Sequence, residues 1–345
     1  MIWKRQSAKL IRISNPLKLI EYCARVCYAS TDKIKEDSAM PFVKGLVHNH
    51  HWTPLEHAYI HIYLDEIEDS RVQSYVEGMY KVAAPGDWFF ADRKLTRGAF
   101  YRGQDERGRF LAGNMRDIYV WMSRNDDSLD LYNSSAVSLA DDYAVFEILT
   151  DRGVATEFFR HRTMSYDDDG YERGAISAEA DLEPDLSINQ QSTRYVNFNK
   201  KEFSVILPEP APFAYNPGSP EYQEWLGSCQ ASYDAYRYLM NTGVSIEYAR
   251  NVLPLSLATT VIMSGSIRNW MYVMNLRLAR AAHPQARLLA CLIFRELEAA
   301  FPKQIDDIIC QGKLDDNTPL VAVRTYADAI EYEIHHNKEL ANGKC

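Results

Sequence analysis

Two short apolar runs of strand length stand among segments with helical periodicity, and this alternation constrains the fold more than any other feature. Residues 58–64 are rich in Tyr and Ile and contain neither Gly nor Pro, which favours a β-strand. Residues 143–149 form a second apolar run, followed by Asp151-Arg152-Gly153, a sequence typical of a turn. Strands at separated places with helices elsewhere predict an α/β or α+β fold.

Apolar residues spaced three or four apart predict helices on both sides of these strands. Asn15-Pro16 starts the first helix, residues 41–47 end a second, and an amphipathic helix is expected around 116–122. The remaining predicted helices span 154–160, 220–242, 246–252, 267–280 and 285–300. Gly243 follows the longest of them, in a position where helices commonly end. After Pro302 we expect a mixed polar tail.

The charge balance argues against several classes of partner. Lys and Arg number 38 and Asp and Glu number 47, which gives a formal net charge of −9. Such a chain does not attract nucleic acid or anionic lipid over its whole surface. No stretch approaches the ~18 uncharged apolar residues of a membrane span, and the first residues lack the apolar core of a signal peptide. We therefore expect a cytoplasmic protein without a nucleic-acid or membrane partner.

The cysteines and histidines do not form a convincing metal site. Without a Cys-x-x-Cys pair, reduced thiols are expected instead of disulfides or structural zinc. Cys23 and Cys27 lie four apart on the first helix and could share a metal, but core packing is the favoured interpretation. Five histidines lie close together in the sequence: His48, His50, His51, His57 and His61. Their spacing does not fit the helical zinc motifs, because Thr53 stands where a histidine is needed. We predict no metal site and no cysteine nucleophile.

Arginines are the most informative candidate binding residues in this acidic chain. They are Arg160 and Arg162 on either side of His161, then Arg194, Arg250, Arg268 and Arg277. A guanidinium is permanently charged and offers five donors in a plane, which suits a phosphate or the edge of a heterocyclic ring. Solvated surface arginines are the default alternative. Arg268 and Arg277, however, lie in apolar surroundings where an unpaired charge is costly, so they are expected to meet an anionic partner.

These residues resemble the motifs of the flavin-dependent thymidylate synthases. The sequence FFRHRTMS, followed after an interruption by NQQSTRYV, is similar to the family's Arg-His-Arg, seven residues, Ser motif. Four further elements resemble the family in the family's order: ARVCY at 24–28, HWTPLEH at 51–57, RNVLP at 250–254, and NLR at 275–277 with HPQ at 283–285. Together the matches cover about residues 10–302.

The resemblance implies a central mixed sheet flanked by helices, in a homotetramer whose active sites are shared between subunits. It also implies an enzyme that converts dUMP to dTMP by reductive methylation. Methylenetetrahydrofolate would be the carbon donor, FAD the hydride carrier and NADPH the reductant. Two alternatives stay open: a flavin-dependent dUMP hydroxymethylase on the same scaffold, and a non-catalytic nucleotide- or flavin-binding paralogue.

The resemblance further implies roles for individual residues. The dUMP-binding residues would be Glu157, Arg160, Gln190, Gln191, Ser192, Arg194, Arg250 and Arg277. The FAD-binding residues would be Thr53, Arg160, His161, Arg162, Gln190, Ser266 and Arg268. His51 would border the flavin and folate pocket. Arg277 would be the catalytic residue, because its fixed charge stabilises the pyrimidine ring ionised at N3 and so makes C5 electron-rich.

The sequence departs from the family pattern at the split motif. Residues 163–191 separate Arg-His-Arg from Ser, and the excess lies at about 166–187. This insertion holds eight acidic residues and one basic residue, so most of the chain's net charge resides there. A solvated loop and a lid or subunit contact are both open interpretations. We predict one catalytic domain over residues 1–310, with insertions at about 66–134 and 166–187, and a C-terminal extension over 311–345.

Overall fold

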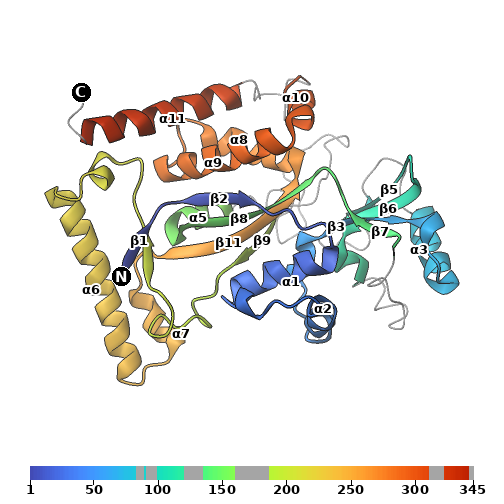
Figure 1. Cartoon of the computed structure of the whole chain (residues 1–345), viewed down its shortest axis with the longest axis horizontal. Helices are drawn as coiled ribbons and strands as arrows, with labels where there is room; N and C mark the ends of the chain where they lie inside the picture. Colours follow the sequence, from blue (N-terminus) through green and yellow to red (C-terminus); the bar gives the residue numbers. More distant parts are fainter. Residues whose placement is uncertain (83–88, 91–98, 120–134, 160–185, 311–321, 342–345) are drawn as a thin grey trace.

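Helices cover both faces of a central sheet in the computed structural model of the chain (Figure 1). The structure describes residues 1–82, 89–90, 99–119, 135–159, 186–310 and 322–341. Sheets and helices together confirm the predicted α/β (α+β) class.

The central sheet has four strands in the order β2-β8-β11-β9. Their bounds are Ser7–Leu10, Tyr143–Asp151, Ala258–Ser266 and Ser187–Gln190, respectively. β8 and β11 pair antiparallel along their whole lengths, with Tyr143 opposite Ser266 and Asp151 opposite Ala258. β9 pairs with the middle of β11, where Gln190 lies opposite Val261. Buried residues run along β8 and β11 on both faces, as a sheet between two layers of helices requires.

One face of the central sheet packs against α8 (Ile267–Leu278) and α9 (Pro284–Ala300). Trp270 of α8 is fully buried, and its ring centroid lies 5.0 Å from that of Phe146 on β8. Its indole N–H donates to the Ala144 carbonyl at 3.0 Å, so the one polar atom of this large side chain is satisfied. This layer places the N-terminus of α8 directly after β11.

The opposite face packs against α1 (Pro16–Cys27), with α2 (Ala39–His48) and the short helix η2 (Thr53–His57) beside it. Asn15 caps α1 by accepting from the Lys18 N–H at 3.0 Å, and Pro16 occupies the first turn as predicted. Cys23 and Cys27 are both buried, which confirms the core-packing interpretation. Burial raises the pKa of the Cys27 thiol to about 12, so this thiol is inert at neutral pH.

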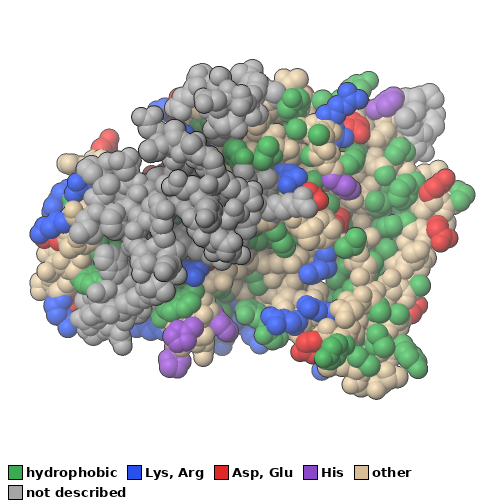
Figure 2. Space-filling model, turned by 180° about the vertical axis from the view of Figure 1, so that it is seen from behind, with side chains coloured by type: hydrophobic (Ala, Val, Ile, Leu, Met, Phe, Trp, Pro, Cys, Tyr) green, Lys and Arg blue, Asp and Glu red, His purple; other side chains and the backbone are tan. Residues whose placement is uncertain are grey.

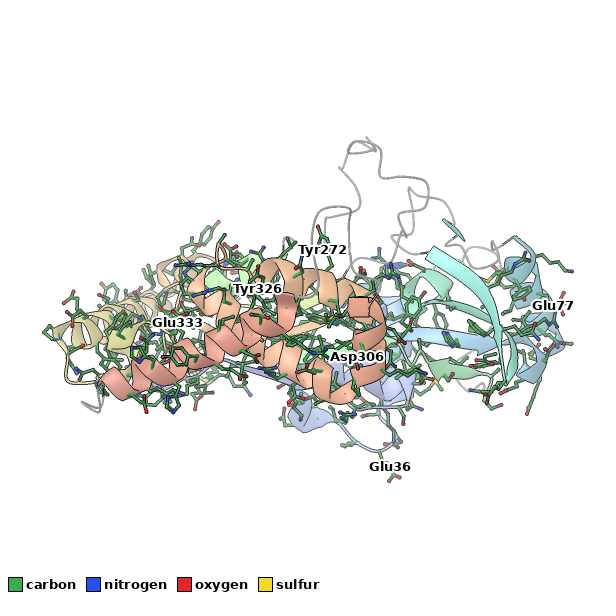
Figure 3. All side chains as sticks on the ribbon, turned by 90° about the horizontal axis from the view of Figure 1, so that it is seen from above. Glu36, Glu77, Tyr272, Asp306, Tyr326 and Glu333 are labelled. Atoms are coloured by element: carbon green, nitrogen blue, oxygen red, sulfur yellow. The ribbon has the colours of Figure 1, made fainter. Side chains whose placement is uncertain are left out.

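A second sheet, in the order β4-β5-β6-β3-β7, extends the molecule at one end (Figure 1). Its strands span Phe89–Phe90, Ala99–Asp105, Gly108–Asn114, Tyr59–Tyr63 and Val137–Leu139, respectively. α3 (Ser70–Val82) packs against it, and Figure 3 shows Glu77 of this helix at the end of the molecule far from Glu333. Three of its strands, β4, β5 and β6, lie within residues 66–134, the longer of the two predicted insertions.

The other end of the molecule is built around α6 (Pro220–Asn241), which Ser219 caps through the Tyr222 N–H. A parallel pair of strands, β1 (Ile2–Lys4) and β10 (Ser204–Ile206), lies beside it (Figure 1). After α6 the chain forms α7 (Ile246–Ala249) and the 3-10 helix η6 (Arg250–Val252). Three other 3-10 helices, η1, η3 and η5, span Thr31–Lys33, Leu64–Glu66 and Pro212–Tyr215.

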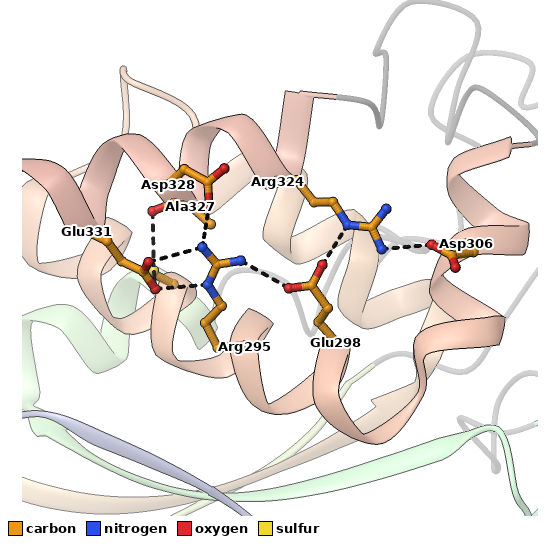
Figure 4. Close-up of polar contacts among 8 residues, drawn as sticks. Arg295, Glu298, Asp306, Arg324, Ala327, Asp328 and Glu331 are labelled. Carbon is orange, nitrogen blue, oxygen red and sulfur yellow. Dashed lines mark hydrogen bonds and ion pairs between the residues drawn. The ribbon is translucent and has the colours of Figure 1, made fainter.

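The C-terminal region differs from the expected polar tail, because it forms α10 (Pro302–Cys310) and α11 (Ala322–Ala341). α11 packs on α8 and α9 and buries Val323, Ala327 and Ile330. Figure 4 shows the ion pairs between Arg295 and Arg324 and the carboxylates around them: Glu298, Asp306, Asp328 and Glu331. Among the described helices, none is long and apolar enough to cross a membrane.

The two predicted strands and the predicted helices are present, with small shifts of their boundaries. The predicted turn at 151–153 is wrong, since Asp151 ends β8 and α5 (Arg152–Phe159) starts at the next residue. The reason is that the Asp151 carboxylate accepts from the Val154 N–H at 2.7 Å and caps the helix. The helix expected at 116–122 occupies 115–119 within the described residues. Ser187, placed at the end of the insertion, is already part of β9.

Candidate active site

The segment that follows β9 is held in place by its backbone. The Gln191 N–H donates to the Thr260 carbonyl on β11 at 2.8 Å, and the Ser192 N–H donates to the Cys27 carbonyl at the end of α1 at 3.1 Å. The Ser192 hydroxyl oxygen accepts from the Arg194 N–H at 3.2 Å. Its O–H hydrogen therefore stays available as a donor for a bound ligand.

Arg250 reaches this segment from η6. Its Nη1 donates to the Thr193 hydroxyl at 3.3 Å, across 57 residues of sequence. Thr193 is buried between Ser192 and Arg194, and the Arg194 side chain is exposed, with its guanidinium 5.6 Å from the Tyr195 ring centroid. Three residues predicted to bind the nucleotide, namely Ser192, Arg194 and Arg250, thus lie close together.

Sequence reasoning missed Arg152, which lies in the same place. Its Nη2 donates to Oε1 of Gln190 at 3.4 Å. Burial, followed by the positive charge of Arg250, lowers the pKa of Arg152. A signal for this residue was present, because it stands between a strand and a helix, at the carboxyl end of the strand.

Arg277 and Glu157 form a second part of the site. Nη1 of Arg277, near the end of α8, lies 3.3 Å from Oε2 of Glu157 on α5. The Arg277 side chain keeps 14% of its surface exposed and Glu157 keeps 34%. The carboxylate therefore supplies the anionic partner that the apolar surroundings of Arg277 require.

The residues predicted to contact flavin lie toward the other end of β11. Ser266 ends β11 and caps α8 by accepting from the Asn269 N–H at 3.1 Å, and Arg268 occupies the first turn of that helix. Ser266 is five positions along β11 from Val261, the partner of Gln190, which corresponds to about 17 Å at the rise of a strand. Gln190, predicted to touch both ligands, therefore lies with the nucleotide-binding residues.

The short helix η2 approaches the same region of β11 and carries Thr53 at its start. Nδ1 of the fully buried His57 lies 2.8 Å from the Ser264 hydroxyl, which joins η2 to the middle of the sheet. His51 precedes η2 and is exposed. Hydroxyl and guanidinium donors at the first turn of a helix suit the phosphate groups of a dinucleotide cofactor, so the residues present fit FAD.

Other parts of the predicted site lie outside the described residues. Arg160, His161 and Arg162 are among them, and so is the insertion as far as residue 185.

On the face shown in Figure 2, Lys and Arg side chains gather near the middle of the described surface. Across the described ranges, no group of three His, Cys, Asp or Glu side chains is arranged to hold a metal ion.

The chain matches a known protein family over most of its length. A family model described as thymidylate synthase complementing protein matches residues 9–77 and 141–303. These two ranges contain all of the site residues named above, from His51 to Arg277, and leave out the sheet strands β4 to β7.

Individual relatives named flavin-dependent thymidylate synthase are similar to the chain at modest identity. The relative from Tropheryma whipplei (strain TW08/27) is 26% identical over 188 residues, which is 47% of this chain and 69% of the relative. That from Geobacter sulfurreducens is 32% identical over 116 residues, 34% of this chain and 48% of the relative. That from a strain of Thermus thermophilus is 30% identical over 183 residues, 52% of this chain and 62% of the relative.

The chain is also similar, to a lower degree, to a solved structure. It is a crystal structure of the UMP/dUMP methylase PolB from Streptomyces cacaoi bound with 5-Br dUMP. The identity is 14%, the TM-score is 0.37, and the match covers 88% of this chain and 94% of that one.

Proposed function

The chain belongs to the thymidylate synthase complementing protein family, and from this premise we propose that it is a flavin-dependent thymidylate synthase. In this proposal the enzyme methylates dUMP to dTMP, with methylenetetrahydrofolate as carbon donor and FAD reduced by NADPH as the source of hydride. The names of the similar relatives support the flavin-dependent methylation. NADPH as the reductant and methylenetetrahydrofolate as the carbon donor are part of the proposal alone.

One observation carries the proposal. Arg250 donates to Thr193, so that an arginine from η6 lies beside the Ser-Thr-Arg segment of residues 192–194. A hydroxyl and guanidinium groups converging from distant parts of the chain are what a phosphate ester requires, namely a neutral donor and bidentate cations.

The 5′-phosphate of dUMP binds at this segment. The Ser192 hydroxyl donates to a phosphate oxygen, because its own oxygen already accepts from the Arg194 N–H. Arg194 and Arg250 supply the positive charge. Gln190 and Gln191, which continue the same segment from β9, lie between the two substrates and complete the predicted dUMP contacts together with Arg160 and Glu157.

Arg277 acts on the pyrimidine ring. Glu157 orients its guanidinium through the 3.3 Å contact, and the Arg277 side chain stays partly exposed. A fixed positive charge stabilises the ring ionised at N3, so that C5 is electron-rich enough to attack the one-carbon unit. A bound flavin supplies the hydride that completes the methyl group.

Thr53, Ser266 and Arg268 would hold FAD at the other end of β11, together with Gln190. Arg160, His161 and Arg162 complete this set, and His51 borders the flavin and folate pocket. The length of β11 that separates Ser266 from Gln190 suits a cofactor that is itself extended.

We further propose that the enzyme is a cytoplasmic homotetramer with shared active sites. Support comes from large apolar side chains that stay exposed near the site: Tyr195 is 65% exposed, Tyr248 72% and Leu255 75%. Covering such residues with another subunit is favourable. Within each subunit, residues 1–310 form one catalytic domain with insertions at about 66–134 and 166–187, and 311–345 form an extension.

The absorption spectrum of the purified protein, followed by a titration with dUMP, tests the proposal. We expect the spectrum of an oxidised flavin and a perturbation of that spectrum on adding dUMP. With methylenetetrahydrofolate and NADPH present, mass spectrometry should identify dTMP as the product. Light scattering should give the mass of four chains.

Two outcomes would contradict this function. If 5-hydroxymethyl-dUMP is the sole product, the protein is a hydroxymethylase on the same scaffold. If the protein is colourless, binds no added FAD and does not oxidise NADPH, it is a non-catalytic nucleotide-binding paralogue.

A further inference from the structure

Arg152 has a well-defined position but no structural role that explains its charge. Its backbone N–H donates to the carbonyls of Leu255 and Leu257 at 3.0 and 3.2 Å, which fixes the start of α5 against the segment after η6. These backbone contacts could be made by any residue other than proline. The guanidinium therefore needs a separate explanation.

The guanidinium of Arg152 is poorly satisfied. Its Nη1 is buried from solvent and has no hydrogen-bond partner. Its Nη2 makes one contact, the 3.4 Å hydrogen bond to Gln190, which is at the long end of the range for such bonds. An arginine carries five donors, and leaving them unpaired in a partly buried position is costly.

The carboxylate of Asp151, the preceding residue, does not compensate for this charge. Oδ1 of Asp151 accepts from the Val154 N–H at 2.7 Å, and Oδ2 accepts from Nε2 of Gln285 at 3.0 Å. Both oxygens are thus engaged elsewhere. Among the residues that the structure describes, Arg152 has no ion pair.

A second cation stands beside it. Burial lowers the pKa of Arg152, and the positive charge of Arg250 lowers it further. Both guanidiniums donate hydrogen bonds to the short segment 190–193: Arg152 donates to Gln190, and Arg250 donates to Thr193. The exposed Glu247 lies near Arg250 and Arg194, but it makes no ion pair within 4.0 Å with either in the described part of the chain.

We propose that Arg152 is a phosphate-binding residue that acts with Arg250 on the 5′-phosphate of the substrate nucleotide. This inference rests on the proposed function for the identity of the nucleotide. A phosphate monoester carries close to two negative charges at neutral pH, which matches two adjacent guanidiniums. Its oxygens replace Gln190 as the acceptor for Arg152 and supply the partners that the free protein lacks.

The variant Arg152→Gln tests the proposal through a comparison of two ligands. Binding of dUMP should weaken about 10- to 100-fold, the effect of losing a charge-assisted hydrogen bond. Binding of deoxyuridine, which has the same base and sugar without the phosphate, should stay unchanged. Arg152→Lys should restore part of the dUMP affinity, and Arg237→Gln, which removes an exposed arginine on α6, is the matched control.

The thermal stability of the same variants separates a binding role from a structural one. Without ligand, Arg152→Gln should melt no lower than the wild type, because it removes a desolvated charge beside another cation. The rise in melting temperature on adding dUMP should shrink. A structural arginine would behave in the opposite way, with a lower melting temperature for the free variant.

Several results would overturn the proposal: equal loss of dUMP and deoxyuridine binding, unchanged dUMP affinity, or a loss of FAD binding with dUMP binding intact. If the wild-type protein binds no dUMP at all, the proposed function fails instead. The arginine pair is then tested with inorganic phosphate. Phosphate binding by the wild type that Arg152→Gln loses supports the pair, and equal binding by both proteins refutes it.

Discussion

Arg277 and Glu157 form an ion pair, with Nη1 of the arginine 3.3 Å from a carboxylate oxygen, although 120 residues separate them in sequence. The contact joins the last turn of α8 to α5, on the same side of the central sheet as α9. Because α5 also carries Arg152 at its start, the two arginines proposed to act on the base and on the phosphate are linked through one short helix.

Replacing Arg277 by Ala should reduce turnover to a small residual rate while FAD stays bound. Removing one fixed donor that stabilises developing charge typically lowers kcat by about 10²- to 10³-fold. The flavin contacts proposed at Thr53, Ser266 and Arg268 are not touched by this change. Steady-state production of dTMP and the flavin absorbance of the same sample measure the two effects.

The matched control for Arg277→Ala is Arg280→Ala, which removes an exposed arginine just after α8. It should leave both turnover and flavin content at the wild-type level. Turnover at the wild-type rate in Arg277→Ala would show that the assignment of the catalytic residue is wrong.

Replacing Arg194 by Ala should mainly weaken the binding of dUMP. Its guanidinium is exposed and stands one residue from Thr193, the partner of Arg250. Loss of a charge-assisted contact to phosphate predicts a rise in Kd of about 10-fold or more. Calorimetric titration of the purified variant checks this, and a Kd equal to that of the wild type would exclude a phosphate role for Arg194.

Most of the helices around the central sheet could be predicted from the sequence because their signals are local. Asn15 with Pro16 marks the start of α1, and the spacing of apolar residues defines α8 and α9. The short strands β1, β2, β9 and β10 were missed. Each has three or four residues, and their pairing depends on distant partners that no local pattern reveals.

The candidate site shows the same division between local and distant information. Motif resemblance identified Gln190, Arg250 and Arg277, which the structure places near one another or near an acidic partner. It did not identify Arg152, because this residue belongs to no recognised motif. Its place between a strand and a helix was a signal, but the missing partner of its guanidinium is seen only in the folded structure. The folded structure likewise shows that the Asp151 carboxylate accepts hydrogen bonds from Val154 and Gln285.

Stability should depend on pH through Asp117. Desolvation raises the pKa of this buried carboxyl group to about 7, against an ordinary value of 3.8. Between these values the folded state binds the extra proton, so the free energy of unfolding decreases as the pH rises from about 4 to about 7. Asp117→Asn keeps an acceptor for the Asn114 amide, which lies 2.6 Å from the carboxylate, and removes the titration.

The stability of Asp117→Asn relative to the wild type should therefore increase across this pH range and stay constant above it. The difference amounts to at most about 4 kcal/mol, from a shift of roughly three pKa units. Urea denaturation at pH 5 and pH 8 measures it. A stability difference that is the same at both values would contradict the raised pKa.

The C-terminal helix α11 is held by an apolar face and by ion pairs, and two variants decide which matters more. Ile330 packs against α9 and its neighbours and is only 2% exposed. Truncating a buried Ile to Ala costs about 2–5 kcal/mol of stability. Arg295 pairs with Glu331 at 2.9 Å and with Asp328 at 2.5 Å, but these carboxylate side chains are 52% and 69% exposed. Exposed pairs of this kind contribute about 0–1 kcal/mol each and are screened by salt.

Ile330→Ala should therefore lower the free energy of unfolding more than Arg295→Ala does. It should also speed amide hydrogen exchange along residues 322–341, because local opening of α11 becomes less costly. The effect of Arg295→Ala should largely disappear at about 1 M salt, where the Debye length is roughly 3 Å, whereas that of Ile330→Ala should persist. If Arg295→Ala costs more than Ile330→Ala at high salt, the ion pairs and not the apolar face anchor this helix.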